Sequence, residues 1–325
     1  MIVPDQNNET AKVELGTYIE PVSLAVSPGD LHNHALVCGC DEATNDAICM
    51  RVAQMVKGCG RPVLIIEPDK EEYLAWAEMQ NKSLAPEEQW HIFRVGMDGG
   101  GGPSHEVEQL VENGLTHGQK TDEEWPTSLT SLRSGLSGEL GCVLDGVAHA
   151  EQPEESVELF QKPCVVNLMG IRDASAKRFV MNLLLLAAGA YDKSAWMSGF
   201  SRKRGAESEG LARLVVIQSA RRLFWKEGDG VMSDDMQPID LSGELLDYLK
   251  EVRNYGQNVL LADQSPSLLG KDVVDLSGLK VCGRLPCGDD EDLMRDAMGV
   301  SSFRSLENGE MIVRIGSSAP ARIGV

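Results

Sequence analysis

Short apolar runs recur along this chain, and most are followed by a segment with helical periodicity. The run PVLIIEP at 62–68 lacks the polar alternation of a half-exposed strand, which is typical of a strand buried on both faces. The predicted strands span 34–39, 62–68, 90–96, 162–171, 212–220, 257–266, 279–286 and 309–316. The predicted helices span 46–60, 71–80, 174–195, 242–256 and 290–299. This order predicts an α/β fold with a mainly parallel sheet flanked by helices.

The regular order is interrupted between residues 97 and 160. A glycine-rich loop, MDGGGGPSH at 97–105, is followed by polar sequence with predicted helices near 105–113, 126–140 and 153–161. We therefore expect a small, mainly helical insertion at about 97–160 within a larger fold.

The chain carries a formal net charge of −20 at pH 7. A protein that neutralises DNA phosphates over its whole surface carries the opposite balance, so we expect contact with nucleic acid only through a larger complex. The densest basic stretch, SRKRG at 201–205, is interpreted as a solvated loop. The longest apolar run, at 179–190, is shorter than the roughly 20 residues that span a bilayer. The N-terminus lacks the features of a signal peptide, and we expect a cytoplasmic protein without a membrane partner.

Eight cysteines are scattered along the chain without a Cys-x-x-Cys pair. Several lie in predicted strands, where cysteine behaves as a small buried apolar residue, and this favours a reducing compartment over a disulfide framework. The spacing of His32, His34, Cys38 and Cys40 is one that zinc can use. The interpretation that we prefer is a histidine turn that leads into a buried strand.

The segment after the predicted strand at 34–39 has the order of a phosphate-binding loop. The strand ends at Gly39, a short polar stretch follows, and an amphipathic run begins at Ala47. In the motif G-x-x-x-x-G-K-[ST], glycines let backbone N–H groups surround phosphate, while the lysine and the hydroxyl bind phosphate and Mg²⁺. The second glycine, the lysine and the hydroxyl are replaced here by Thr44, Asn45 and Asp46.

Six segments, taken in order, resemble the HerA/FtsK superfamily of P-loop ATPases, and the HerA-like branch in particular. They are LHNHALVCG, RPVLIIEPDKEEY, PCVVNLMGI with AKRFVMNLLLLAAGAY, RLVVIQSARRLF, YLKEVRNYGQNVLLADQSPSLL and LENGEMIV. The resemblance implies a RecA-like P-loop NTPase fold over residues 29–325, in which the insertion at about 97–160 is the part that fits poorly. Residues 1–28 are then an N-terminal extension, and the β-barrel that HerA proteins usually carry there is expected to be absent or trimmed.

The same resemblance identifies a Walker A motif that has lost its function. Alignment with the family's G-x-T-G-S-G-K-T keeps Gly39 and replaces the inner glycines with Glu42 and Thr44. The degenerate Walker A residues are Gly39, Cys40, Asp41, Glu42, Ala43, Thr44, Asn45 and Asp46. Three of them are carboxylates placed where phosphates would lie, and like charges at ~4 Å repel by about 1 kcal/mol in water.

The predicted Walker B strand has lost its acidic residues as well. The VVI run at 215–217 matches the family's Walker B strand, which in the family is followed by two carboxylates that support Mg²⁺ and polarise water. This chain has Gln218 and Ser219 instead. Neither side chain acts as a general base at neutral pH.

Two further positions match the family. Gln264 stands at the sensor position, after LLAD. Arg253 stands where the family has an arginine that can reach the nucleotide of a neighbouring subunit, an arginine finger. The alternative for Arg253 is a surface arginine that pairs with Glu251 or Asp247.

These losses favour a pseudo-ATPase, a catalytically inactive HerA-like subunit with a structural or regulatory role. The resemblance implies protein partners, as a homo-oligomer or a mixed ring with an active paralogue or effector, in DNA processing, conjugation or phage defence. No cofactor is then expected. An active ATPase or DNA translocase is one alternative, which would use ATP and Mg²⁺ and needs a cation such as Arg51, Lys70 or Arg284 to replace the lysine. The other alternative is a binding module that takes a cation or basic peptide in the old nucleotide cleft.

Overall fold

The computed structural model describes residues 13–18, 23–95, 158–172, 174–197, 211–224, 242–286 and 288–325. The chain divides into two compact units. Unit 1 combines Met1–Arg61 with Ala206–Val325, and unit 2 is the intervening segment Pro62–Gly205. Both units contain parallel strands and flanking helices, so the predicted α/β class with a mainly parallel sheet is confirmed.

The strands of unit 1 form a mixed sheet in the order β2-β1-β11-β10-β9-β3-β8-β7. Their bounds are β1 Val13–Tyr18, β2 Ser23–Val26, β3 Ala35–Cys38, β7 Arg213–Gln218, β8 Gln257–Asp263, β9 Leu279–Cys282, β10 Glu310–Ile315 and β11 Ala321–Gly324. The strand β3 pairs in parallel with β8 and β9, and β7 pairs in parallel with β8. The pairs from β9 through β10 and β11 to β1 and β2 are antiparallel.

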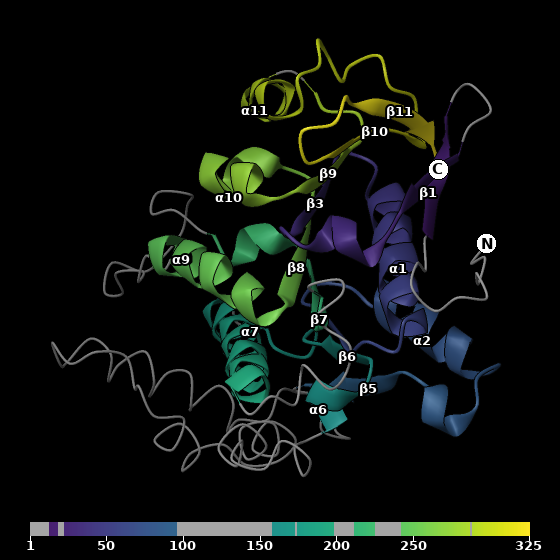
Figure 1. The fold of residues 1–325 in the computed structure, drawn as a ribbon, viewed down its shortest axis with the longest axis vertical. Coiled ribbons are helices and arrows are strands. Elements are labelled where there is room, and N and C mark those ends of the chain that lie inside the picture. The colour runs from purple at the N-terminus through teal and green to yellow at the C-terminus, as the bar shows by residue number, and fades with distance from the viewer. Residues whose placement is uncertain are drawn as a thin grey trace, which may run out of the picture. The chain divides into compact units, whose positions relative to one another are not determined.

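Helices cover both faces of the parallel part of this sheet, which explains its uninterrupted apolar strands. The helix α1 packs against β1, β3, β7 and β8, and Figure 1 shows α9 and α10 on the opposite face. The helices of unit 1 are η1 Pro28–Leu31, α1 Glu42–Gly58, η4 Ala220–Arg222, α9 Ser242–Val252, η5 Arg253–Tyr255, η6 Pro266–Leu268, α10 Lys271–Leu276 and α11 Asp289–Met298. Leu36, Val215 and Leu260 are fully buried in the core between these layers.

Among its described residues, unit 2 has three parallel strands in the order β4-β6-β5. Its elements are β4 Val63–Glu67, α2 Glu72–Asn81, η2 Pro86–Glu88, β5 His91–Arg94, α6 Glu158–Gln161, β6 Cys164–Asn167 and α7 Ala174–Met197. The buried carboxylate of Glu67 accepts hydrogen bonds from the N–H groups of Tyr73 and Leu74, which fixes the start of α2 behind β4. No helix in the described part of the chain combines the length and the apolar character that a membrane crossing needs.

The predicted strands and helices are present at their expected places, and the differences lie in short or locally controlled elements. The predicted N-terminal extension contributes β1 and β2 to the sheet, and β11 and α10 were not predicted, since each has six residues or fewer. The helix α1 begins at Glu42 rather than near residue 46. The predicted insertion at 97–160 lies outside the described residues except for its end, where α6 is found. The basic stretch at 201–205 also lies outside the described residues.

Candidate functional site

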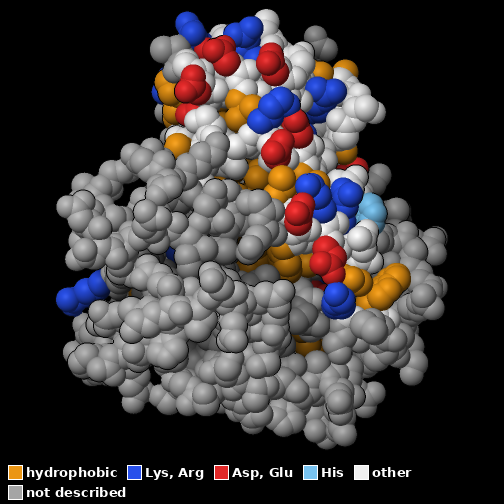
Figure 2. Space-filling model, turned by 90° about the vertical axis from the view of Figure 1, so that its left-hand side faces the viewer, with side chains coloured by type: hydrophobic (Ala, Val, Ile, Leu, Met, Phe, Trp, Pro, Cys, Tyr) orange, Lys and Arg blue, Asp and Glu red, His pale blue; other side chains and the backbone are white. Residues whose placement is uncertain are grey.

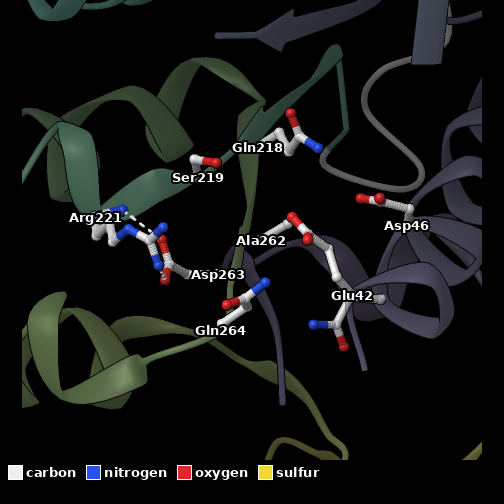
Figure 3. A pocket seen from close by; sticks show the side chains of 9 residues that line it. Glu42, Asp46, Gln218, Ser219, Arg221, Ala262, Asp263 and Gln264 are labelled. Carbon is white, nitrogen blue, oxygen red and sulfur yellow. Dashed lines mark hydrogen bonds and ion pairs between the residues drawn. The ribbon is translucent and has the colours of Figure 1, made fainter. Parts of the chain in front are cut away.

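The carboxyl ends of β3, β7 and β8 meet at one place in unit 1. These strands are parallel, with Cys38 opposite Asp263 and Gln218 opposite Ala262. A small cavity lies beyond them and is lined by Glu42, Asn45, Asp46, Gln218, Ser219, Arg221, Ala262, Asp263 and Gln264 (Figure 3). The structure therefore brings together residues of the predicted Walker A, Walker B and sensor positions.

The cavity has a volume of about 20 Å³. That is room for one water-sized group, whereas ligand sites for small organic molecules measure about 300–1,000 Å³. The described residues therefore leave only a small hollow where the predicted Walker A, Walker B and sensor positions meet.

The helix α1 is capped at its N-terminus by the chain's own carboxylate. Asp41 is the N-cap, and its side chain accepts hydrogen bonds from the Thr44 N–H at 3.2 Å and the Thr44 hydroxyl at 2.6 Å. The Thr44 hydroxyl, aided by the N–H groups of Thr44, Gly309 and Ala43, lowers the pKa of Asp41 despite its partial burial. The positive end of a helix is where a phosphate would bind, and here an internal anion holds that place.

The other loop amides are used inside the protein too. Cys40 N–H donates to the carbonyl of Arg284 at 3.0 Å, and Asn45 N–H donates to the carbonyl of Asp41 at 3.1 Å. The Asn45 side chain, at the position of the Walker lysine, donates through Nδ2 to the carbonyl of Gly39 at 2.9 Å. A phosphate cradle needs N–H groups that point outward, and these three donors point into the protein.

The retained glycine of the predicted Walker A segment has a packing role. Gly39 has φ +134°, and a Cβ atom there would lie 2.9 Å from the Cα and N atoms of Gly283. Gly283 N–H donates to the carbonyl of Cys38 at 2.8 Å, so the backbones after β3 and β9 run in close contact. The close contact between the Gly39 and Gly283 backbones therefore requires a glycine at position 39, whether or not phosphate binds.

The end of β7 carries polar groups without partners. Gln218 is 2% exposed, and neither its Oε1 nor its Nε2 has a hydrogen-bond partner in the described part of the structure. The buried Oδ1 of Asn45 is unpartnered in the same sense. Each buried polar group left unpaired costs about 1–3 kcal/mol. Ser219 follows with φ 51° and ψ 48°, the left-handed conformation that costs a non-glycine residue roughly 1–2 kcal/mol.

Asp263 and Arg221 form an ion pair that the sequence did not predict. Asp263 Oδ1 lies 3.3 Å from Arg221 Nη1, and the carboxylate also accepts from Arg221 N–H at 2.8 Å and Ser265 N–H at 3.0 Å. The Asp263 side chain is fully buried, and burial raises its pKa against the lowering effect of these donors. The sequence signal for this pair is the acidic residue in LLAD at 260–263 together with the basic stretch ARR at 220–222.

The histidine-cysteine cluster does not form a zinc site in the described residues. His34 Nδ1 accepts from Val259 N–H at 3.0 Å, and Nε2 bonds to the Leu249 carbonyl at 2.8 Å. Both ring nitrogens are therefore occupied, and His34 precedes β3 whereas Cys38 ends it. Within the part of the chain that the structure describes, no three His, Cys, Asp or Glu side chains group closely enough to hold a metal ion.

Arg253 lies away from the cavity. It begins η5, immediately before β8, whereas the cavity lies beyond the carboxyl end of that strand. The seven residues of β8 span about 20 Å. The two acids considered as its partners bond elsewhere: Asp247 pairs with Lys250 and Glu251 accepts from the Tyr255 hydroxyl. A role for Arg253 toward a neighbouring subunit stays a prediction.

The surface of unit 1 carries mixed charges in the view of Figure 2. Acidic and basic side chains are interspersed over its upper, described part, where α10 and α11 lie. Ion pairs within these helices, such as Lys271 with Asp275 and Arg295 with Asp292, account for part of this pattern. This part of the face lacks the single-sign basic surface that tracks a phosphate backbone.

Comparison with known proteins identifies the fold. VirB4 of Thermoanaerobacter pseudethanolicus is similar over 100% of this chain and 98% of its own, with 13% identity and a TM-score of 0.53. The genome packaging NTPase B204 from Sulfolobus turreted icosahedral virus 2, in complex with AMPPCP, matches 89% of this chain and 94% of its own at 12% identity and TM-score 0.45. The bacterial conjugative coupling protein TrwBdeltaN70 matches 93% of this chain and 86% of its own, at 11% identity and a TM-score of 0.46. No protein-family model and no curated protein matches the sequence. The similarity to VirB4 supports the predicted RecA-like fold and by itself gives no activity.

Proposed function

We propose that this chain is a HerA-like ATPase homologue that does not hydrolyse ATP and serves as a structural or regulatory subunit of an oligomeric complex. The order of the sequence motifs supports the HerA-like branch, and the fold shared with VirB4 agrees with it. DNA processing, conjugation or phage defence is the context that this resemblance suggests.

The observation that carries the proposal is the internal capping of α1. Asp41 accepts from the Thr44 N–H in the first turn of the helix, and the Asn45 amide donates to the Gly39 carbonyl where the Walker lysine would face phosphate. A triphosphate would have to displace a carboxylate of lowered pKa from the helix and then lie beside Glu42 and Asp46. Both steps oppose binding electrostatically.

Hydrolysis also lacks its chemical groups at the expected positions. Gln218 ends β7 and Ser219 follows it, where the family has its two acids, and neither side chain accepts a proton at neutral pH. Asp263 is a carboxylate of the same cavity, but three donors and its burial hold it against Arg221. A residue held in this way supports the wall of the site rather than an attacking water.

Of the cations considered as substitutes for the lysine, Arg51 is engaged within the protein. Arg51 donates through Nη1 to the carbonyl of Leu15 at 2.7 Å, which ties α1 to β1. Arg284 is an exposed residue that lines a second cavity of about 240 Å³, which shares Glu42 with the first. That cavity is lined by Cys40, Asp41, Glu42, Thr44, Gly283, Arg284, Glu307, Asn308, Glu310 and Met311. Lys70 belongs to unit 2.

Calorimetry of the full chain with ATP and Mg²⁺ tests the proposal. We expect no heat of binding at tens of micromolar protein, and a defined oligomeric mass by light scattering. The matched variant is Asp41→Asn, which keeps a polar cap but removes the negative charge from the helix N-terminus. Binding of ATP to the wild type at micromolar affinity would contradict the proposal. Binding only to Asp41→Asn would support it and identify the carboxylate as the barrier.

A further inference from the structure

Two free thiols face each other across neighbouring strands in the core of unit 1. Cys38 ends β3 and Cys282 ends β9, and the two residues stand directly opposite each other in the parallel pairing of these strands (Figure 1). Side chains at opposite positions of a parallel pair project from the same face of the sheet. Both side chains are fully buried, and neither cysteine is in a disulfide.

The spacing of the two strands suits a covalent bond between these sulfur atoms. Neighbouring strands lie about 4.7–4.9 Å apart, and disulfides join residues whose Cα atoms are about 4.4–6.8 Å apart. The hydrogen bond from the Gly283 N–H to the Cys38 carbonyl, at 2.8 Å, fixes the register at this end of the strands. Burial raises the pKa of the Cys282 thiol, and the interaction with the Cys38 thiol raises this pKa further. The two thiols are therefore near enough to influence each other in the reduced protein.

We infer that Cys38 and Cys282 form a reversible oxidation site, at which a hydroperoxide joins β3 to β9 through a disulfide. One thiol of the pair, as its thiolate, attacks an oxygen of the hydroperoxide and the O–O bond breaks. This step gives a sulfenic acid, and the thiol proton leaves with the alcohol, or with water where the oxidant is hydrogen peroxide. The second sulfur then attacks the sulfenic sulfur, and the hydroxyl leaves with the second thiol proton as water. Both sulfur atoms are oxidised, the peroxide takes up the two electrons, and a small-molecule thiol reverses the bond by exchange.

A small oxidant can approach the pair from the second cavity. This cavity, of about 240 Å³, is lined by Cys40 and Gly283, which follow Cys38 and Cys282 closely in the chain. Cys40 is exposed, so the cavity leads from solvent to the segments that come directly after both buried thiols. The thiolate is the reactive form, and the raised pKa of Cys282 keeps little of it at neutral pH. We therefore expect slow oxidation that accelerates as the pH rises.

The disulfide acts as a clamp on a central strand pairing of unit 1. Cys38 and Cys282 lie near opposite ends of the sequence, and a cross-link that closes a long loop restricts the unfolded chain strongly. The bond also lies beside the close approach of Gly39 to Gly283, which precedes the Asp41 cap of α1. The oxidised protein should therefore resist unfolding more than the reduced protein does.

The test is oxidation of the full chain with hydrogen peroxide, followed by alkylation of the remaining thiols in denaturant and by peptide mass mapping. We expect a peptide that links Cys38 to Cys282, a faster reaction at pH 8.5 than at pH 7.0, and complete reversal by dithiothreitol. The oxidised chain should unfold at a higher urea concentration than the reduced chain. The same oxidation in denaturing urea should give mixed pairings, because the sheet then no longer sets the register.

The matched control is Cys164→Ala, because Cys164 is also a fully buried strand cysteine but has Leu64 and His91 at the opposite positions. This variant should keep the linked peptide and the rise in the urea midpoint, whereas Cys282→Ala should lose both. Cys38→Ala makes the same test from the other strand if Cys282→Ala does not fold.

Two results would overturn the inference. One is a folded wild type in which both thiols stay open to alkylation after oxidation, or in which either is linked to another cysteine. The other is a linked chain that resists urea no better than the reduced chain. Binding of ATP in the calorimetric test would contradict the proposed function alone, so the two failures are distinguishable.

Discussion

Replacement of His34 by glutamine tests whether a buried neutral imidazole makes unit 1 sensitive to acid. His34 is 2% exposed, and its neighbours define its tautomer: Nδ1 accepts from Val259 N–H, so Nε2 carries the proton and donates to the Leu249 carbonyl. Burial lowers the pKa of His34 to about 4, with smaller contributions from the positive charges of Arg253 and His32 against the Leu249 bond. Protonation of Nδ1 would also break the bond to Val259.

The sign of the pH dependence follows from proton linkage. The folded-state pKa of about 4 lies below the ordinary value of 6.5, so the unfolded chain binds this proton first as the pH falls. The stability that neutral His34 contributes is complete above pH 6.5 and is lost between pH 6.5 and 4. At 1.36 kcal/mol per pKa unit the total is about 3 kcal/mol, of which about 2 kcal/mol is lost by pH 5.

Urea denaturation of the full chain, followed by far-ultraviolet circular dichroism at pH 7.5, 6.0 and 5.0, measures this loss. Glutamine can offer one acceptor and one donor but does not titrate, so the free energy of unfolding of His34→Gln should vary less with pH by about 2 kcal/mol over this range. The exposed His32 gives the control: its contribution to the pKa of His34 is small, so His32→Gln should change the slope much less than His34→Gln does. Parallel pH profiles for the wild type and His34→Gln would refute the reasoning.

Three further substitutions test the local geometry of the site by urea denaturation. Asp41→Ala should lower the free energy of unfolding by about 1 kcal/mol through loss of the cap. Asp272→Ala, which removes an exposed acid from the first turn of α10, should change the free energy of unfolding little, and equal losses would reject the capping role. Gly39→Ala should lower the free energy of unfolding by about 2–4 kcal/mol, because the added Cβ meets the Gly283 backbone. Gly60→Ala should lower it by less despite the positive φ of Gly60, because nothing lies within 4 Å of the added Cβ. Asp263→Ala should lower the free energy of unfolding more than Arg221→Ala does, because it leaves the N–H groups of Arg221 and Ser265 without their acceptor. The Arg221 side chain is 42% exposed, so its removal should have the smaller effect, and the reverse order would contradict this account.

The gathering of Asn45, Gln218 and Gln264 at one cavity follows from the order of the predicted strands. Each of these residues lies at or beyond the end of a strand with an apolar, doubly buried pattern, and parallel strands bring their carboxyl ends to one edge. The short strands β1 and β2 were missed because their place depends on pairing with β11, at the other end of the sequence. Local propensity holds no information about that pairing.

The internal chemistry of the site was less accessible from the sequence. The Arg221–Asp263 pair joins residues 42 positions apart, and it depends on how the ends of β7 and β8 turn. The early start of α1 depends on Asp41 and Thr44 acting together as a cap, a pattern obscured by alignment of the same residues with a loop motif. The packing reason for Gly39 lies just after β9, some 240 positions away, where the Gly283 backbone leaves no room for a Cβ.

The central place of β3 has a consequence for the order in which the protein can be made. His34, next to β3, bonds to Val259 across a separation of 225 positions, and both strands that flank β3 lie beyond residue 256. At about 5–20 residues per second, a ribosome needs on the order of 10–40 s to add those residues after β3 has been synthesised. Throughout that interval β3 has an apolar sequence and no partner strand. Unit 2, a single continuous segment, can meanwhile fold from local contacts, so a chain that stalls after residue 205 would present an aggregation-prone strand beside a folded insert.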